Sequence, residues 1–211
     1  MSALRISRRT IVLAVSALAL AAATPAIFPY CLTGVRWPAT PVNVYYNPSG
    51  KLTTNQCISA SQMDSAVTGG VSAWGELRNG GTTSKAANKR DGQNTVGWAK
   101  LGGQTLGVTN YLDYDRTRTV ACGANTFANL YEADVRITTT YRWTSGGGQC
   151  PCAAGSAFYL NGVTAHEMGH VIGLCHVNSP NALMYPSFDV CENKGKTSDE
   201  NAGENAIYSC H

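Results

Sequence analysis

Three of the four histidines in this 211-residue chain lie within eleven positions, together with one acidic residue. The segment reads His-Glu-Met-Gly-His-Val-Ile-Gly-Leu-Cys-His and runs from His166 to His176. In a helix, His166 and His170 are one turn apart, so both imidazoles project from one face and can hold one small ion. Glu167 is rotated by about 100° from His166 and would lie beside that ion, within reach of a water molecule bound to it.

The residues after the helix complete the set of metal ligands. Gly173 is suited to a helix end because glycine adopts the left-handed conformation that reverses the chain, and the reversal would return His176 as a third ligand. Three neutral nitrogens leave the fourth position of a tetrahedral zinc ion open for water, as in catalytic rather than structural sites. The pattern predicts one catalytic Zn²⁺ and, with the pKa of its water lowered to about 7, Glu167 as the general base.

Helices and short strands must position these residues. Hydrophobic spacing predicts a helix over 59–77 and a second over 161–174, and the capping box from Thr197 to Glu200 predicts a third that runs to about 208. Apolar and β-branched runs, and the Gly/Ser-rich stretch, predict strands at 42–46, 95–100, 106–111 and 133–138 and a loop at 144–148. Strands first and helices late indicate one α/β or α+β domain.

The first 26 residues have the layout of an export signal. Three arginines precede an apolar run from Ile11 to Ala23 that contains no acidic residue. Such a run is shorter than the roughly 20 residues of a membrane span but suits the core of a removable signal peptide. We expect a signal peptide at 1–26 and a secreted domain, extracellular or periplasmic, at 27–211. Both the twin-arginine and the general export route stay open.

The formal charge of +3 comes from the same segment. The chain has 16 basic and 13 acidic residues, and removal of Arg5, Arg8 and Arg9 would leave 13 basic residues against 13 acidic ones. A formally neutral domain offers no basic surface to a phosphate backbone. We therefore expect no nucleic-acid partner, and no membrane partner after the signal is removed.

All eight cysteines lie after the predicted signal. They are Cys31, Cys57, Cys122, Cys150, Cys152, Cys175, Cys191 and Cys210. An even number in an exported chain indicates disulfide bonds in an oxidising compartment, and the spacing does not select among the 105 ways to pair eight cysteines. A zinc–cysteine site is disfavoured, because the one close pair, Cys150 and Cys152, is tighter than the usual zinc knuckle.

The segment from His166 to His176 resembles the extended zinc motif of the metzincin endopeptidases. Residues Ala182–Pro186, with Met184 eight positions after the third histidine, resemble their methionine turn. The amino-acid sequence of that turn is most similar to that of the matrixins, the matrix metalloproteinase branch with its secreted bacterial relatives. The resemblance implies an α/β (α+β zincin) fold: a twisted, mostly parallel sheet with an antiparallel edge strand, an active-site helix and a small C-terminal subdomain.

The resemblance also assigns roles to residues. By it, His166, His170 and His176 would bind zinc. Glu167 would act as base and then as acid, and Met184 would form the hydrophobic floor of the site.

Residues of the substrate pocket are implied in the same way. Pro186, Ser187 and Phe188 resemble the wall that accepts the substrate side chain after the cleaved bond, with Phe188 where tyrosine is more usual. Leu106 and Gly107 belong to a segment that resembles the edge strand pairing with substrate.

A second metal site, the state of Cys175 and calcium binding each need separate consideration. The one other histidine is His211, so the family's second, structural zinc site is expected to be missing. Cys175 lies inside the zinc motif and is expected to be bridged, with Cys191 as its suggested partner. Asp113 and Asp115 could help to bind Ca²⁺, although two carboxylates in a loop are usually only solvated.

The favoured hypothesis is a secreted zinc-dependent endopeptidase, a monomer that hydrolyses protein or peptide substrates with a Glu-activated, zinc-bound water. One alternative is a catalytically idle secreted binding module on the same fold. An intact general base and three ligands argue against that alternative. Another is a narrow-specificity metallohydrolase acting on cell-wall peptides, which differs from the favoured hypothesis only in substrate.

Overall fold

A computed structural model describes residues 11–12, 30–52, 54, 56–145 and 157–210. Of the predicted signal peptide, only Ile11 and Val12 are among the described residues. Cys150, Cys152 and most of the predicted loop at 144–148 also lie outside the described residues. No helix in the described part of the chain is long and apolar enough to cross a membrane.

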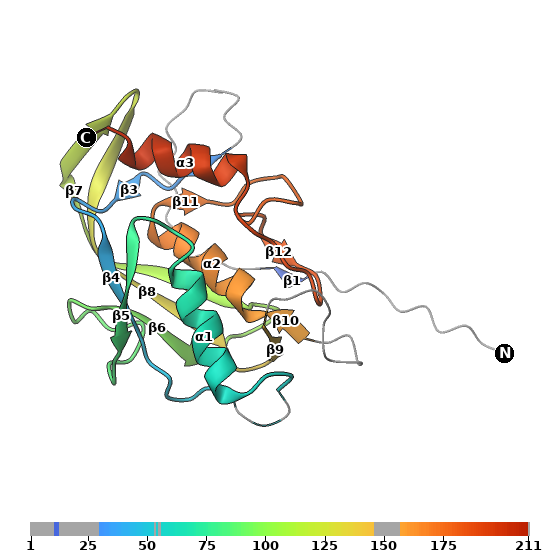
Figure 1. Ribbon diagram of the computed structural model, residues 1–211. Coiled ribbons are helices and arrows are strands. Elements are labelled where there is room, and N and C mark those ends of the chain that lie inside the picture. Colours follow the sequence, from blue (N-terminus) through green and yellow to red (C-terminus); the bar gives the residue numbers. More distant parts are fainter. Residues whose placement is uncertain (1–10, 13–29, 53, 55, 146–156, 211) are drawn as a thin grey trace.

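The elements follow one another as Figure 1 labels them. The helices are α1 (Ala60–Val71), α2 (Leu160–Val171) and α3 (Ser198–Tyr208). The strands are β1 (Ile11–Val12), β2 (Cys31–Leu32), β3 (Val35–Arg36), β4 (Val42–Tyr46), β5 (Leu77–Thr82), β6 (Asn94–Ala99), β7 (Gly107–Cys122), β8 (Asn125–Thr138), β9 (Arg142–Thr144), β10 (Ala157–Tyr159), β11 (Leu174–Cys175) and β12 (Ser187–Phe188).

A twisted sheet forms the centre of the molecule. Its parallel strands lie in the order β3–β8–β6–β4–β5, and β7 joins it by antiparallel pairing with β8. Because β7 follows one edge of β8 along nearly its whole length, β3 and β6 share the opposite edge. A mostly parallel sheet with one antiparallel edge strand confirms the fold class expected from the resemblance.

Helices α1 and α2 pack together across the sheet (Figure 1). The helices approach closely because Gly70 has no side chain, and a Cβ there would meet Thr164 and Ala165 of α2. The indole of Trp74, just after α1, donates to the carbonyl of Ala165 at 2.8 Å. Met168 of α2 is fully buried in the same core. The site-bearing helix is thus held by its neighbour as well as by the sheet.

Local signals predicted the helix starts better than the helix ends. The capping box at Thr197 and Glu200 is present at the start of α3. A second capping box, from Ser59 to Gln62, starts α1. Helix α1 ends at Val71, with Ser72 as its C-cap, rather than near residue 77. Leu77 begins strand β5, which the sequence does not predict because it carries few β-branched residues.

The β7–β8 hairpin is much longer than the two short strands predicted there. The expected 106–111 and 133–138 are only the inner ends of β7 and β8, which continue outwards to a turn containing Gly123, where φ is +57°. The outer part beyond Tyr111 is polar, so its sequence lacks the apolar run that identified the inner part. The end of α3 lies beside this hairpin (Figure 1).

The disulfides correct one expectation. Cys175 is bonded to Cys31, not to Cys191 as suggested, because β2 and β11 pair with these two cysteines directly opposite, 4.9 Å apart at Cα. A separation of 144 residues hides this pairing in the sequence. Cys122 at the hairpin turn is bonded to Cys210 after α3. Cys57 and Cys191 are also disulfide-bonded, and no described cysteine is free.

Candidate metal centre and active site

Three imidazoles converge at the C-terminal end of α2. His166 and His170 lie one turn apart on the helix, as their spacing predicts. Gly173 follows with φ of +104°, and a Cβ there would collide with the carbonyl of Val35. The reversal and the short strand β11 bring His176 back to the helix. The Nε2 atoms of the three histidines are 3.1, 3.2 and 3.3 Å apart.

These nitrogens fit a zinc ion. Tetrahedral coordination with Zn–N bonds of about 2.0–2.1 Å places two ligand nitrogens about 3.3–3.4 Å apart. His166 Nδ1 lies 2.6 Å from the carbonyl oxygen of Leu183, and His170 Nδ1 lies 2.8 Å from that of Leu174. A carbonyl only accepts, so each Nδ1 carries the proton and each Nε2 presents a lone pair. Two lone pairs directed at one point, with His176 Nε2 3.2 and 3.3 Å from the same two nitrogens, favour a cation between the three imidazoles.

The surroundings keep the three histidines neutral. Burial lowers the pKa of His170 to about 3, with a further contribution from His176. Burial and the neighbouring His170 lower the pKa of His166 well below its usual range. Burial also lowers the pKa of His176. Neutral imidazole is the form that binds metal, so the site is set for a cation at neutral pH. These three histidines are the one group of three or more metal-ligand side chains among the described residues.

Glu167 is fully buried beside the histidines. Its Oε2 accepts a hydrogen bond of 2.7 Å from the hydroxyl of Thr109 on β7, whereas its Oε1 has no hydrogen-bond partner in the described structure. Burial raises the pKa of the Glu167 carboxyl to about 8, and the hydrogen bond from Thr109 opposes that shift. A carboxyl group with a pKa near neutrality can both take up and release a proton.

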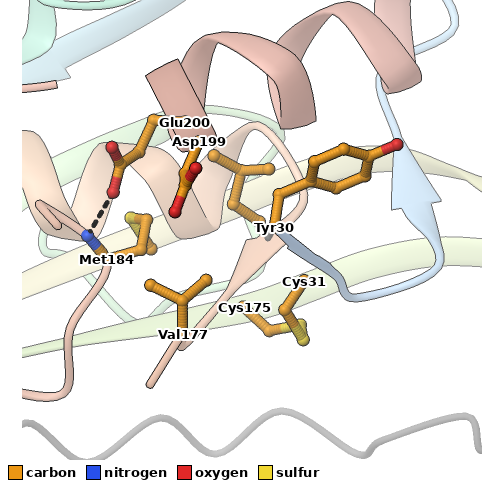
Figure 2. A pocket seen from close by; sticks show the side chains of 8 residues that line it. Tyr30, Cys31, Cys175, Val177, Met184, Asp199 and Glu200 are labelled. Atoms are coloured by element: carbon orange, nitrogen blue, oxygen red, sulfur yellow. Dashed lines mark hydrogen bonds between the residues drawn. A yellow bond between two sulfur atoms is a disulfide. The ribbon is translucent and has the colours of Figure 1, made fainter. Parts of the chain in front are cut away.

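The predicted methionine turn lies under the helix. The Met184 side chain is buried against Gly169, where a Cβ would overlap the Met184 sulfur. Figure 2 shows Met184 beside Glu200 of α3, whose Oε1 accepts the Met184 N–H at 2.9 Å. The turn therefore connects the helix that carries His166 and His170 with the start of α3. The capping box predicts the local contacts of Glu200 but not this one, because 16 residues separate the pair.

The residues predicted to form the substrate pocket differ in burial and in distance from His166 and Glu167. The Phe188 ring packs edge-on against His166, with centroids 5.7 Å apart, and Ser187 is buried next to it, whereas Pro186 is half-buried. Gly107 faces Glu167, but Leu106 is fully buried in the hydrophobic core. Strand β12, which holds Ser187 and Phe188, is paired along its backbone with β1.

An open hollow of about 540 Å³ lies beside the third ligand. Its lining includes His176, Val177 and Ser179, which follow β11, together with Tyr30 and Asp199. Figure 2 shows the adjoining pocket, where Val177 and the Cys31–Cys175 disulfide lie near Tyr30 and Asp199. The N-terminal segment and α3 thus both contribute to the surroundings of the site, which no local motif predicted.

The two carboxylates considered for calcium lie away from the histidines, on the outer part of β7. Asp113 is paired with Arg90 at 2.6 Å, and Asp115 accepts hydrogen bonds from the backbone and hydroxyl of Thr117. Neither belongs to a group of three or more metal-ligand side chains among the described residues.

The mostly parallel sheet with its antiparallel edge strand and the three-histidine cluster define a metzincin-like α/β domain. The family model for matrixins matches residues 52–209, and the chain belongs to the matrixin family. It is similar to matrix metalloproteinase-20 from Homo sapiens, 38% identical over 55 residues, which are 26% of this chain and 10% of the human protein. It is also similar to metalloendoproteinase 1 from Glycine max, 42% identical over 45 residues, 21% of this chain and 15% of the plant protein.

Proposed function

We propose that this protein is a secreted zinc-dependent endopeptidase. The observation that carries the proposal is the convergence of three Nε2 atoms within 3.3 Å beside a buried glutamate with one free carboxyl oxygen. Membership of the matrixin family supports a metalloprotease domain. Because the matched segments are small parts of the curated relatives, activity and substrates are proposed from the site itself.

In this proposal His166, His170 and His176 bind zinc, and Glu167 moves protons. A zinc ion here would supply Lewis acidity and lower the pKa of a bound water to about 7. The free Oε1 of Glu167 takes a proton from the attacking water, and the same carboxyl returns it to the leaving amine. Met184 has a structural part, filling the space under α2 that Gly169 leaves open.

The substrate would bind as an extended strand along β7. This strand pairs with β8 along one edge, and its other edge pairs with no described strand. Exposed backbone groups on such an edge can pair with a peptide, while pockets select its side chains. Phe188 and Ser187 would form the wall of the pocket for the residue after the cleaved bond, with Pro186 at its margin. Loss of the predicted signal, which includes β1, would free the backbone edge of β12 beside this wall.

Secretion is proposed from residues 1–26 together with the disulfides. The described disulfides are compatible with an extracellular protein, since such bonds persist in oxidising compartments. Sequencing the N-terminus of protein recovered from the culture medium tests this part, because export with cleavage would remove the first 26 residues or so. Protein retained in the cell with an intact N-terminus would contradict it.

The enzymatic proposal is tested with purified protein, one equivalent of Zn²⁺ and casein as an unstructured substrate. We expect one zinc ion per chain and cleavage that stops with a chelator and returns with zinc. A zinc-loaded protein that cleaves nothing in a broad peptide library would favour the idle binding module. Cleavage confined to cell-wall peptides would favour the narrow-specificity hydrolase.

A further inference from the structure

The inner end of β7 contacts the carboxyl group of Glu167 directly. Thr109 is almost fully buried, and its hydroxyl oxygen lies 2.7 Å from Glu167 Oε2 and 3.0 Å from the Glu167 main-chain oxygen. One side chain of the sheet therefore touches both the backbone and the side chain of the same helical residue. The two residues are 58 positions apart in the sequence.

This contact is the one hydrogen bond that the Glu167 carboxyl receives within the described residues. Oε1 has no partner, and Thr109 alone donates to Oε2. A threonine hydroxyl has a single proton, and the shorter distance directs it to the carboxyl oxygen rather than to the main chain. Without that hydroxyl, a buried carboxylate would have no donor at all, and its orientation would be set by packing alone.

Gly107 shapes the other side of the same carboxyl group. Residues 107 and 109 face the same side of β7, since side chains alternate along a strand. A Cβ at Gly107 would lie 2.6 Å from Glu167 Oε1 and 2.9 Å from the carboxyl carbon. These contacts are too short for any side chain to be accommodated without moving the carboxyl group. Gly107 thus leaves space for one oxygen while Thr109 holds the other.

We propose that Thr109 is a positioning residue for Glu167, and that Gly107 is required beside it so that the carboxyl group can occupy this orientation. The proposal rests on the endopeptidase function proposed above and goes beyond it, because it assigns a part in the reaction to the edge strand's side chains. Thr109 touches neither substrate nor metal in this scheme. It acts by keeping Oε2 fixed, so that Oε1 remains available for the proton.

The expected signature is a loss of kcat without a loss of metal or of substrate binding. A hydrogen bond to a charged group contributes a factor of roughly ten to one hundred when it is needed in the transition state. Misplacing a general base affects the chemical step, whereas peptide binding depends on the backbone edge of β7 and on the pocket. KM and zinc content are therefore expected to stay near those of the wild type.

The test compares Thr109→Val, which keeps the shape but removes the hydroxyl, with Thr109→Ser, which keeps the hydroxyl. Thr138→Val is the matched control, because Thr138 is a buried threonine on β8 whose hydroxyl contacts the backbone N–H of Thr140 and not α2. Peptide cleavage, zinc content and thermal unfolding are measured for all three. We expect kcat to fall roughly tenfold to one hundredfold in Thr109→Val and to stay within about threefold of wild type in the other two.

Equal kcat in Thr109→Val and wild type, or an equal fall in the Val and Ser variants, would overturn the proposal. If Thr109→Val does not fold, Gly107→Ala decides, since the added methyl group displaces the carboxyl without removing a hydrogen bond. An unchanged kcat in that variant also overturns the proposal. A wild-type protein that binds zinc but cleaves no peptide refutes the proposed function first, and the positioning role with it. An active wild type with an insensitive Thr109 refutes the positioning role alone.

Discussion

The two ends of strand β7 share one hydrogen-bond ladder with β8 but have different surroundings. At the inner end, Gly107 and Thr109 are buried against α2, and the hydroxyl of Tyr111 donates to the carbonyl of His170 at 2.5 Å. At the outer end, Arg116 and Arg118 are exposed. The outer end is joined to the rest of the molecule by the Cys122–Cys210 disulfide at its tip.

The difference shows which constraint acts on each part of the strand. The inner residues are fixed by the fit to the helix that carries His166 and His170, so glycine, threonine and tyrosine each have a specific contact there. The outer residues are mostly polar, and their ion pairs lie at the surface. We therefore expect substitutions to affect catalysis at the inner end and to have little effect on it at the outer end.

The largest effect is expected for Glu167→Ala, because Glu167 of α2 contacts Thr109 at the inner end of β7. Loss of a general base typically lowers the rate by about 10²–10⁴-fold, whereas the three imidazoles that bind zinc are untouched. We expect peptide cleavage to fall by that factor while the zinc content stays at one ion per chain. His170→Ala is the contrasting variant, because it should lose the metal as well. Persistent cleavage by Glu167→Ala would refute the mechanism.

Removal of the Cys31–Cys175 disulfide, near the histidines, or of the Cys122–Cys210 disulfide, at the outer end of β7, gives the next comparison. Both close long stretches of chain, with separations of 144 and 88 residues, so each double Cys→Ser variant should lose roughly 2–5 kcal/mol of unfolding free energy. Only Cys31–Cys175 adjoins the ligand His176. We expect zinc binding to weaken by about tenfold in that variant alone, as measured by competition with a chelator. Equal zinc affinity in the two variants would show that the disulfide does not position the ligand.

The stability of the metal-free protein is expected to depend on pH through His170, whose main-chain carbonyl accepts the hydrogen bond from Tyr111 at the inner end of β7. The pKa of His170 is about 3 in the folded state because of burial, against about 6.5 in an unfolded chain. Between these values the unfolded chain takes up a proton and the folded one does not. Stability is therefore fully present above pH 6.5 and decreases toward pH 3, by at most about 1.4 kcal/mol per pH unit for this group.

Chemical denaturation between pH 4 and 8, for wild type and His170→Gln, measures this contribution. We expect a shallower decrease in the variant, because its side chain does not titrate. Parallel curves for the two proteins would mean that His170 is not held neutral by burial.

The smallest effect is expected at the outer end. Arg90 and Asp113 form an ion pair whose side chains are 68% and 37% exposed, and such pairs contribute about 0–1 kcal/mol. Arg90→Ala should change stability by no more than that and leave peptide cleavage at the wild-type rate. A tenfold loss of kcat in this variant would show that the outer end is coupled to the site, and the distinction between the two ends would fail.

The sequence by itself determined the features that depend on neighbouring residues. The spacing of His166 and His170, the reversal at Gly173 and the capping box at Thr197 all lie within a few positions, where helix geometry relates one residue to the next. The composition of strand β4 predicted its bounds for the same reason. Family resemblance then supplied the sheet type, which the structure confirms.

Only the tertiary structure decided the contacts between distant segments. The Cys31–Cys175 bond depends on the register of β2 against β11, and the contact of Thr109 with Glu167 depends on how β7 lies under α2. The polar outer half of β7 likewise depends on strand pairing with β8 rather than on an apolar pattern. Sheet register and helix packing are set by the whole core, so no short stretch of sequence contains them.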